Sequence, residues 1–193
     1  MMALVTINNV DSDLVLNWMV TKSIIGSIPD KPTHVTPEHC INTKLPFILW
    51  REEAGRPSPV IVNSYSHSGL RLSITTRSGA LIEFSTTYSE YFLSREEVEA
   101  NISRKNLLDK LEKRNLSDYA NSWGLSGPLL VDKNISVQHI DDYTYKAVRI
   151  YGCSNDTNFV GHGSTYIKAG LKLYVQLSWN SETMEVPADI LDS

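Results

Sequence analysis

The stretch TYIKAGLKLYVQLSW, residues 165 to 179, decides the fold because its pattern fits both a strand and a helix. Every odd position from Ile167 to Trp179 is apolar, and polar or small residues and tyrosines fill the even ones, as in a half-buried strand. Such a strand would be about twice the usual length. A helix would place four apolar side chains on one face, namely Ile167, Leu171, Tyr174 and Val175. Thr165 could cap that helix and Asn180 could end it in the left-handed conformation, so the pattern leaves both structures open.

Upstream, residues 8 to 30 predict an amphipathic helix near the N-terminus. Asn, Asp and Ser side chains offer caps, and Gly26 and Pro29 end the run. The residues at helical spacing between them are Leu14, Val15, Trp18, Met19 and Lys22. The prolines of residues 31 to 46 then predict an extended connection.

The middle of the chain predicts three or four antiparallel strands between residues 46 and 92. Four segments are rich in Ile, Val, Thr and aromatic residues: PFILWRE from 46, PVIVNSYS from 59, LRLSITT from 70 and ALIEFSTTY from 80. Ser94 and Glu97 then have the spacing of a capping box, which predicts a helix that continues to about Arg114.

The segment SDYANSWGLSGPLL, residues 117 to 130, has a structural interpretation, which we favour. Ser117 would cap a helical turn, Gly124 or Gly127 would take a positive φ, and Pro128 would exclude helix and begin a strand. Trp123 would fasten this turn to the core.

A functional interpretation of the same segment stays open beside it. Tyr119 and Trp123 would line a shallow aromatic pocket next to Gly127 and the helix that starts at Thr165. An aromatic face with exposed backbone amides suits a nucleobase or a phosphate-bearing ligand.

Two strands are predicted next, over residues 135–140 and 143–152.

Residues 153 to 163 read as a loop that ends in FVGHG (159–163), with His162 between two glycines. Backbone N–H groups at the start of the following helix could receive an anion there. The predicted ligand-binding residues are therefore Tyr119, Trp123, Gly127, His162, Gly163 and Thr165.

Composition excludes several classes of function. With 193 residues and a net charge of −4, the chain lacks the basic excess that nonspecific nucleic-acid binding requires. It has no apolar run long enough to span a membrane and no signal-peptide pattern. Cys40 and Cys153 have no paired spacing and predict free thiols, so we expect a cytoplasmic protein.

The sequence offers little catalytic or metal-binding chemistry. Zinc ligands could come from His34, His39, Cys40, Cys153 and His162. However, the last two lack the close spacing of a structural zinc site. His67 lies among serines but without a nucleophile elbow. We expect no catalytic residues, no metal and no cofactor.

Three segments in order resemble one family. They are LNWMVTKSIIG (16–26), SWGLSGPLLVDKNISV (122–137) and GSTYIKAGLKLYVQLSWNSETMEVPADIL (163–191). Together they resemble the NinX-like phage proteins, a small family of unassigned function from the accessory genes of lambda-like phages and prophages. The matching positions are Leu16, Trp18, Val20, Lys22, Trp123, Gly127, Pro128, Leu129, Leu130, Thr165, Ala169, Lys172, Tyr174, Val175, Val186 and Pro187. The resemblance implies that residues 165–179 form a helix.

The chain departs from the family pattern at Leu125 and Ser126, where the family has Gln and Gly, and it has more residues between the first two segments. We therefore predict a single α+β domain over 1–193, with antiparallel sheet and two or three packed helices. These include an N-terminal helix and a C-terminal helix near 165–179. Residues 30–115 would be a β-rich elaboration inserted into the family core.

The expected function is that of a phage or prophage accessory protein that binds without catalysis, in counter-defence or host modulation. Its partner would be a host protein or a small nucleotide-like ligand in the host cytoplasm, with no nucleic acid and no membrane. One alternative is an immunity-type protein, whose acidic charge would suit a basic toxin. Another is a small nucleotide-directed hydrolase with His162 or His67 as its base. A homo-oligomer formed through strand edges near 59–92 stays open.

Overall fold

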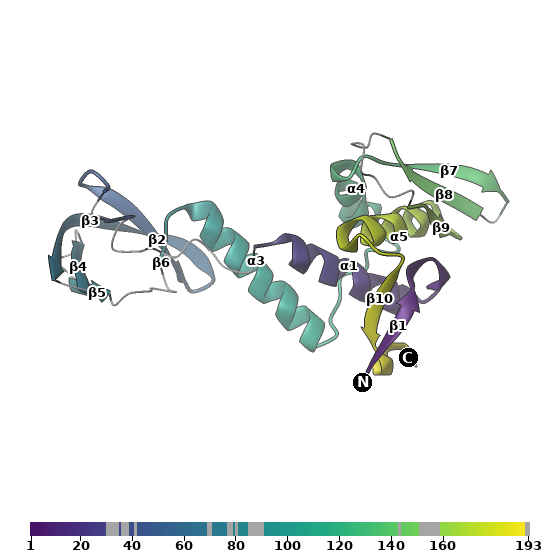
Figure 1. Ribbon diagram of the computed structural model, residues 1–193, viewed down its shortest axis with the longest axis horizontal. Helices are drawn as coiled ribbons and strands as arrows, with labels where there is room; N and C mark the ends of the chain where they lie inside the picture. The colour runs from purple at the N-terminus through teal and green to yellow at the C-terminus, as the bar shows by residue number, and fades with distance from the viewer. Residues whose placement is uncertain are drawn as a thin grey trace. The chain divides into compact units, whose positions relative to one another are not determined.

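A computed structural model describes residues 1–29, 35, 39–40, 42–68, 71–76, 79, 81–84, 91–142, 144–150 and 159–191. The described residues form an α+β protein whose paired strands are antiparallel, with helices near both ends, as predicted. The chain divides into two compact units (Figure 1). Unit 1 comprises Met1–Ser27 and Leu107–Ser193, and unit 2 comprises Ile28–Asn106.

Helix α5 (Tyr166–Trp179) occupies the ambiguous stretch and lies at the centre of unit 1. The Thr165 hydroxyl accepts a hydrogen bond from the Lys168 N–H at 3.2 Å, and Asn180 has a φ of 48°, so both predicted ends are confirmed. Every side chain from Ala169 to Gln176 is buried. Because the middle of the helix is buried on all sides, apolar residues also occur off its main apolar face, and the resulting alternation fits a strand as well.

The elements around α5 form one hydrophobic core. Helices α1 (Asp13–Ser27) and α4 (Trp123–Asp132) contact it, together with a sheet of β7 (Ile135–Asp141), β8 (Thr144–Arg149) and β9 (Gly161–Gly163). Buried side chains from all these elements except β9 join this core. Helix α1 is confirmed, but it is buried on nearly all sides rather than amphipathic.

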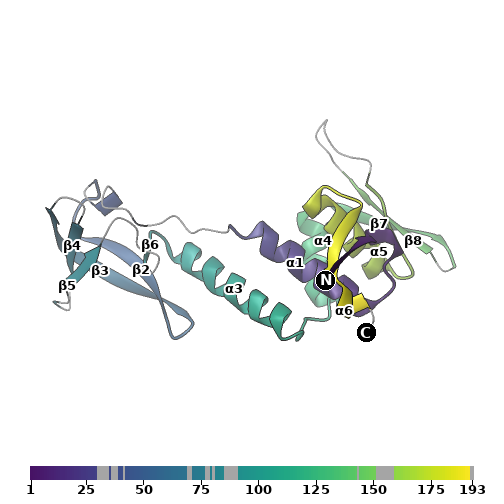
Figure 2. The ribbon, with the colours of Figure 1, turned by 60° about the horizontal axis from the view of Figure 1, so that its bottom comes forward.

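The two ends of unit 1 pair with each other. Strand β1 (Met2–Thr6) is antiparallel to β10 (Thr183–Pro187), and Figures 1 and 2 show them side by side. A short 3₁₀ helix, η1 (Ile7–Asn9), follows β1, and helix α6 (Ala188–Leu191) follows β10. The sequence did not predict this pairing, because the partners lie at opposite ends of the chain and each strand has only five residues.

Unit 2 contains a five-stranded sheet in the order β5-β4-β3-β2-β6. The strands are β2 (Phe47–Glu53), β3 (Arg56–Ser68), β4 (Arg71–Thr76), β5 (Leu81–Phe84) and β6 (Tyr91–Phe92). The antiparallel strands predicted between 46 and 92 are therefore confirmed, but the sheet has five strands rather than three or four, because β6 was not predicted.

Helix α3 (Arg95–Glu112) begins at the predicted capping box. The Glu97 N–H donates to Ser94 Oγ at 3.2 Å, and Glu97 Oε2 accepts from the N–H of Ser94 at 3.4 Å. This reciprocal pair satisfies backbone groups that have no partner within the helix. The capping box is therefore confirmed.

The structural interpretation of residues 117–130 was wrong in its details. Residues 123–132 form helix α4 with Pro128 inside it, neither Gly124 nor Gly127 has a positive φ, and the next strand starts at Ile135. Pro128 removes the N–H that would bond the Gly124 carbonyl. Both residues are exposed, so water can donate a hydrogen bond to this carbonyl instead.

The predicted loop of residues 153–163 also needs correction at its end. Residues 161–163 form strand β9, which pairs with β8. The rest of this segment up to residue 158 lies outside the described residues. The single domain with an elaboration inserted over 30–115 stays a prediction, since the two units are described separately. None of the helices in the described ranges combines the length and the apolar character that crossing a bilayer requires.

Candidate functional site

Four ring side chains form a continuous row at the start of helix α5, and we call this set the aromatic row. Trp123 meets Tyr166 with ring centroids 5.4 Å apart. Tyr166 meets Tyr145 at 6.5 Å, and Tyr145 meets His139 at 4.9 Å. The row therefore connects the beginnings of α4 and α5 to the β7–β8 hairpin.

The rings of the aromatic row are open to solvent. Trp123 is 50% exposed and Tyr166 is 42% exposed, whereas Trp18 of the core is only 7% exposed. His139 is exposed and Tyr145 is half-buried. Apolar ring surface that stays in water, held in place by neighbouring rings, is suited to contact with another molecule.

Trp123 is held in place by its own helix. Gly127 lies one turn further on, and a Cβ at that position would come 2.9 Å from Cε2 of the indole. The ring therefore lies directly against the glycine backbone. Larger side chains at residue 127 would push the ring away from its present place.

A buried asparagine anchors the segment that leads into α4. Asn17 of α1 accepts a hydrogen bond from the Ala120 N–H at 2.8 Å and donates to Asp118 Oδ1 at 3.3 Å. These bonds tie the segment before Trp123 to the core helix. Asn17 thus acts as a positioning residue for the aromatic row.

The β7–β8 hairpin places the other two rings. Tyr145 is directly opposite His139 in the register and opposite Gly163 on its other side. Because side chains alternate along a strand, Tyr145 shares its face with Ala147, which is fully buried. The aromatic row is therefore the solvent-exposed continuation of the core face of this sheet.

The close packing of β9 against helix α5 explains why both ends of this strand are glycine. A Cβ at Gly163 would come 2.5 Å from the Ala169 nitrogen, and a Cβ at Gly161 would collide with the Ala169 carbonyl oxygen. Strand β9 can approach the α5 backbone this closely only with glycine at both positions. This close approach brings β9 against the first turns of α5.

An ion pair joins the first turns of α1 and α5. Lys168 Nζ lies 2.5 Å from Asp13 Oδ1, and Asn121 Nδ2 donates to Asp13 Oδ2 at 3.0 Å. Hydrogen bonds from Lys168 and then Asn121 lower the pKa of Asp13 below its ordinary value of 3.8. The carboxylate thus stays ionised and fixes the helix that carries Tyr166.

The structure brings most of the predicted site residues to the aromatic row. Trp123 belongs to it, Gly127 lies under its indole, Gly163 is paired opposite Tyr145, and Thr165 caps α5 directly before Tyr166. Their role in ligand binding stays a prediction.

The other two predicted residues lie elsewhere. Tyr119 is only 8% exposed and belongs to the core, where burial raises its pKa. His162 is exposed, but it pairs with Lys146 on the opposite face of the sheet from Gly163. Its N–H donates to Asn8 Oδ1 at 3.0 Å.

Sequence reasoning missed Tyr166, Tyr145 and His139. In the sequence, Tyr166 was one residue of an ambiguous pattern, and the other two belonged to ordinary strand segments. Their common position results from helix and strand packing, which no local spacing encodes.

Metal-binding residues do not cluster in the part of the chain that the structure describes. Among those residues, no group of three or more His, Cys, Asp or Glu side chains could hold a metal ion. His34 and Cys153, two of the zinc ligands considered from the sequence, lie outside the described residues.

Comparison of the chain with protein-family models, with curated proteins and with solved structures gave no match in any of the three. The resemblance to NinX-like phage proteins stays a prediction.

Proposed function

We propose that this protein acts by non-catalytic binding, and that the aromatic row is the surface that contacts a nucleotide-type ligand. The observation that carries the proposal is the pair of exposed rings, Trp123 and Tyr166, held together at the start of α5. Kinship with phage accessory proteins, and with it a role in counter-defence or host modulation, is supported by the sequence resemblance alone.

Stacking is the interaction that this surface is built to make. Base–aromatic stacking contributes about 1–3 kcal/mol per base, and it tolerates any base because each has a π face. The rings are set by Gly127 on one side and by the hairpin on the other, so little side-chain entropy is lost on binding.

The start of α5 adds an electrostatic contribution. Helix N-termini carry partial positive charge and favour phosphate groups. Tyr166 is the first residue of α5, none of the residues of its first turn is acidic, and the nearby Asp13 of α1 is paired with Lys168. A nucleotide whose base stacks on the rings could therefore direct its phosphate toward this helix end.

A protein partner is the second candidate. Trp and Tyr are enriched among the residues that dominate protein–protein binding energy, and Trp123 and Tyr166 are half exposed side by side. A host factor could thus use the same surface.

The test is a titration of isotope-labelled protein with AMP, GMP, CMP and UMP, followed by ¹H–¹⁵N correlation NMR. We expect saturable shifts at Trp123, Tyr166 and Tyr145 with at least one nucleotide. Ribose 5-phosphate, which has no base, should leave the rings unchanged. Trp123→Ala should weaken binding at least about tenfold, as the loss of one stacked ring predicts.

Trp179→Ala is the matched control, because this tryptophan is 42% exposed, close to the 50% of Trp123, and lies at the opposite end of α5 from Tyr166. Absence of shifts with all four nucleotides would exclude the nucleotide proposal. A host protein captured from bacterial lysate by the wild type and by Trp179→Ala, but not by Trp123→Ala, would then favour the second candidate.

A further inference from the structure

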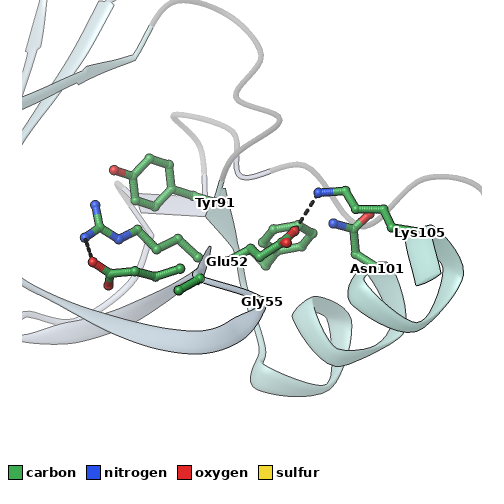
Figure 3. A pocket seen from close by; sticks show the side chains of 9 residues that line it. Glu52, Gly55, Tyr91, Asn101 and Lys105 are labelled. Carbon is green, nitrogen blue, oxygen red and sulfur yellow. Dashed lines mark hydrogen bonds and ion pairs between the residues drawn. The ribbon is translucent and has the colours of Figure 1, made fainter. Parts of the chain in front are cut away.

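Unit 2 contains a polar pocket of its own, with a volume of about 660 Å³. It lies between the tip of the β2–β3 hairpin, strand β6 and helix α3 (Figure 3). This volume is within the range of small-molecule sites. The pocket is separate from the aromatic row, which belongs to unit 1.

Three local structures form the walls. Ala54 and Gly55 both have positive φ, at 51° and 74°, which makes the tight turn of the hairpin. Arg51 of β2 is paired with Tyr91 of β6 in the sheet register. The pocket is thus framed by backbone that hydrogen bonds hold in place.

Helix α3 provides the remaining wall. Asn101 and Lys105 lie one turn apart on it, so both face the same side. Lys105 Nζ lies 2.5 Å from Glu52 Oε2, and Figure 3 shows this pair bridging the helix and the hairpin.

The pocket has equal numbers of positively and negatively charged side chains. Arg51 and Lys105 are cationic, and each is paired with a glutamate: Lys105 with Glu52, and Arg51 with Glu53 at 3.3 Å. The pocket therefore offers acceptors and donors side by side.

This balance restricts the chemistry of a ligand. A phosphate would be repelled by Glu52 and Glu53, and a metal ion by Arg51 and Lys105. An apolar ligand would take both ion pairs out of water without replacing their hydrogen bonds. A neutral ligand with many hydroxyl groups avoids the repulsion by the glutamates, the repulsion by the cationic side chains and the loss of hydrogen bonds.

Hydroxyl groups suit adjacent donors and acceptors. Each hydroxyl donates one hydrogen bond and accepts others, so it can bind a carboxylate and an ammonium group at once. Both ion pairs here are partly exposed, and such pairs are weak enough to share their hydrogen bonds with a ligand. Tyr91 and Asn101 add two more polar side chains to the lining.

We propose that this pocket binds a neutral, polyhydroxylated ligand, a mono- or disaccharide unit, without covalent chemistry. The proposal goes beyond the nucleotide-type binding at the aromatic row and does not depend on it.

The experiment is an NMR titration of the full chain with glucose, galactose, N-acetylglucosamine, maltose and lactose at millimolar concentration. At least one of these neutral sugars should give saturable shifts at Arg51, Asn101 and Lys105. Asn101→Ala and Lys105→Met should each weaken that binding at least about fivefold, since each loses hydrogen bonds to the ligand. Arg95→Ala removes another ion pair of α3, Arg95 with Glu99, and should leave sugar binding unchanged.

Two outcomes would overturn the proposal. One is the absence of shifts at the pocket with all five sugars. The other is tighter binding of glucose 6-phosphate or glucosamine than of any neutral sugar, which would mean that charge governs the site. Trp123→Ala should bind the sugar as the wild type does, so failure at one site leaves the other proposal standing.

Discussion

The rings of Trp123 and Tyr166 meet edge to face, with their centroids 5.4 Å apart and their planes at 61°. Each residue is the first of its helix, so the starts of α4 and α5 converge at this contact. Edge-to-face contact is a favourable geometry for aromatic pairs and fixes the orientation of both rings. Four predictions test the packing around this surface and within each unit.

Gly127→Ala should move the indole of Trp123 while leaving the protein folded. The new Cβ would come 2.9 Å from the ring, but the half-exposed ring can turn toward solvent. Alanine is also the better helix former by about 1 kcal/mol, so stability should change little. The nuclear Overhauser contacts between Trp123 and Tyr166 should disappear. Persistence of these contacts would mean that Gly127 does not determine the position of the Trp123 ring.

Gly161→Ala should destabilise unit 1 by about 1–3 kcal/mol, because its Cβ would collide with backbone atoms of α5 that cannot move aside. Urea unfolding measures this loss. Gly124→Ala is the control, since the nearest atom to its Cβ is Ser122 Oγ at 3.9 Å. That variant should gain about 0.5–1 kcal/mol from helix propensity. Equal effects of the two substitutions would contradict the close approach of β9 to α5.

Asp13→Asn should make the free energy of unfolding depend less on pH in the acidic range. The pKa of Asp13 is lowered in the native protein, mainly by the hydrogen bond from Lys168. Its contribution to stability is therefore complete above the ordinary pKa of 3.8 and is lost as the pH falls through the native value. Unfolding curves of the two proteins should differ at neutral pH and converge in acid. A constant difference at all pH values would exclude this ion pair as the cause.

Cys40 should resist alkylation in the folded protein. The thiol is fully buried in unit 2, and burial raises its pKa to about 11. Iodoacetamide at mildly alkaline pH should react at least about tenfold faster in urea than without it. The measurement uses Cys153→Ser protein, so that a single thiol is followed. Stability should also fall as the pH rises from 9.0, because the unfolded thiol loses its proton first.

Local pattern was sufficient for much of the fold. The capping box at Ser94 and Glu97 and the caps of α5 depend on contacts a few residues apart, and the strands between residues 46 and 92 are recognisable from their local composition. Such interactions are encoded in short spacings. Helix α4 was missed because Pro128 is usually a helix breaker, and here an exposed Gly124 carbonyl removes most of the cost.

The candidate site could be predicted only in part. Trp123 and Gly127 stood out because a tryptophan among glycines is conspicuous in a sequence. Tyr145 and Tyr166 did not, since each is an ordinary tyrosine in a strand or helix until packing brings their rings within 6.5 Å. Tyr119 was misjudged for the converse reason, because its burial depends on elements distant in the chain.

By itself, the sequence determined the antiparallel α+β class, the capping of α3 and the acidic balance of charge, because propensity, capping and composition act locally. Only the tertiary structure decided the pairing of β1 with β10, the burial of α5 on every side and the meeting of four rings at its start. Those features are long-range. They are stabilised by burial and close packing between segments that lie far apart in the chain, and no local sequence pattern indicates which of these segments will meet.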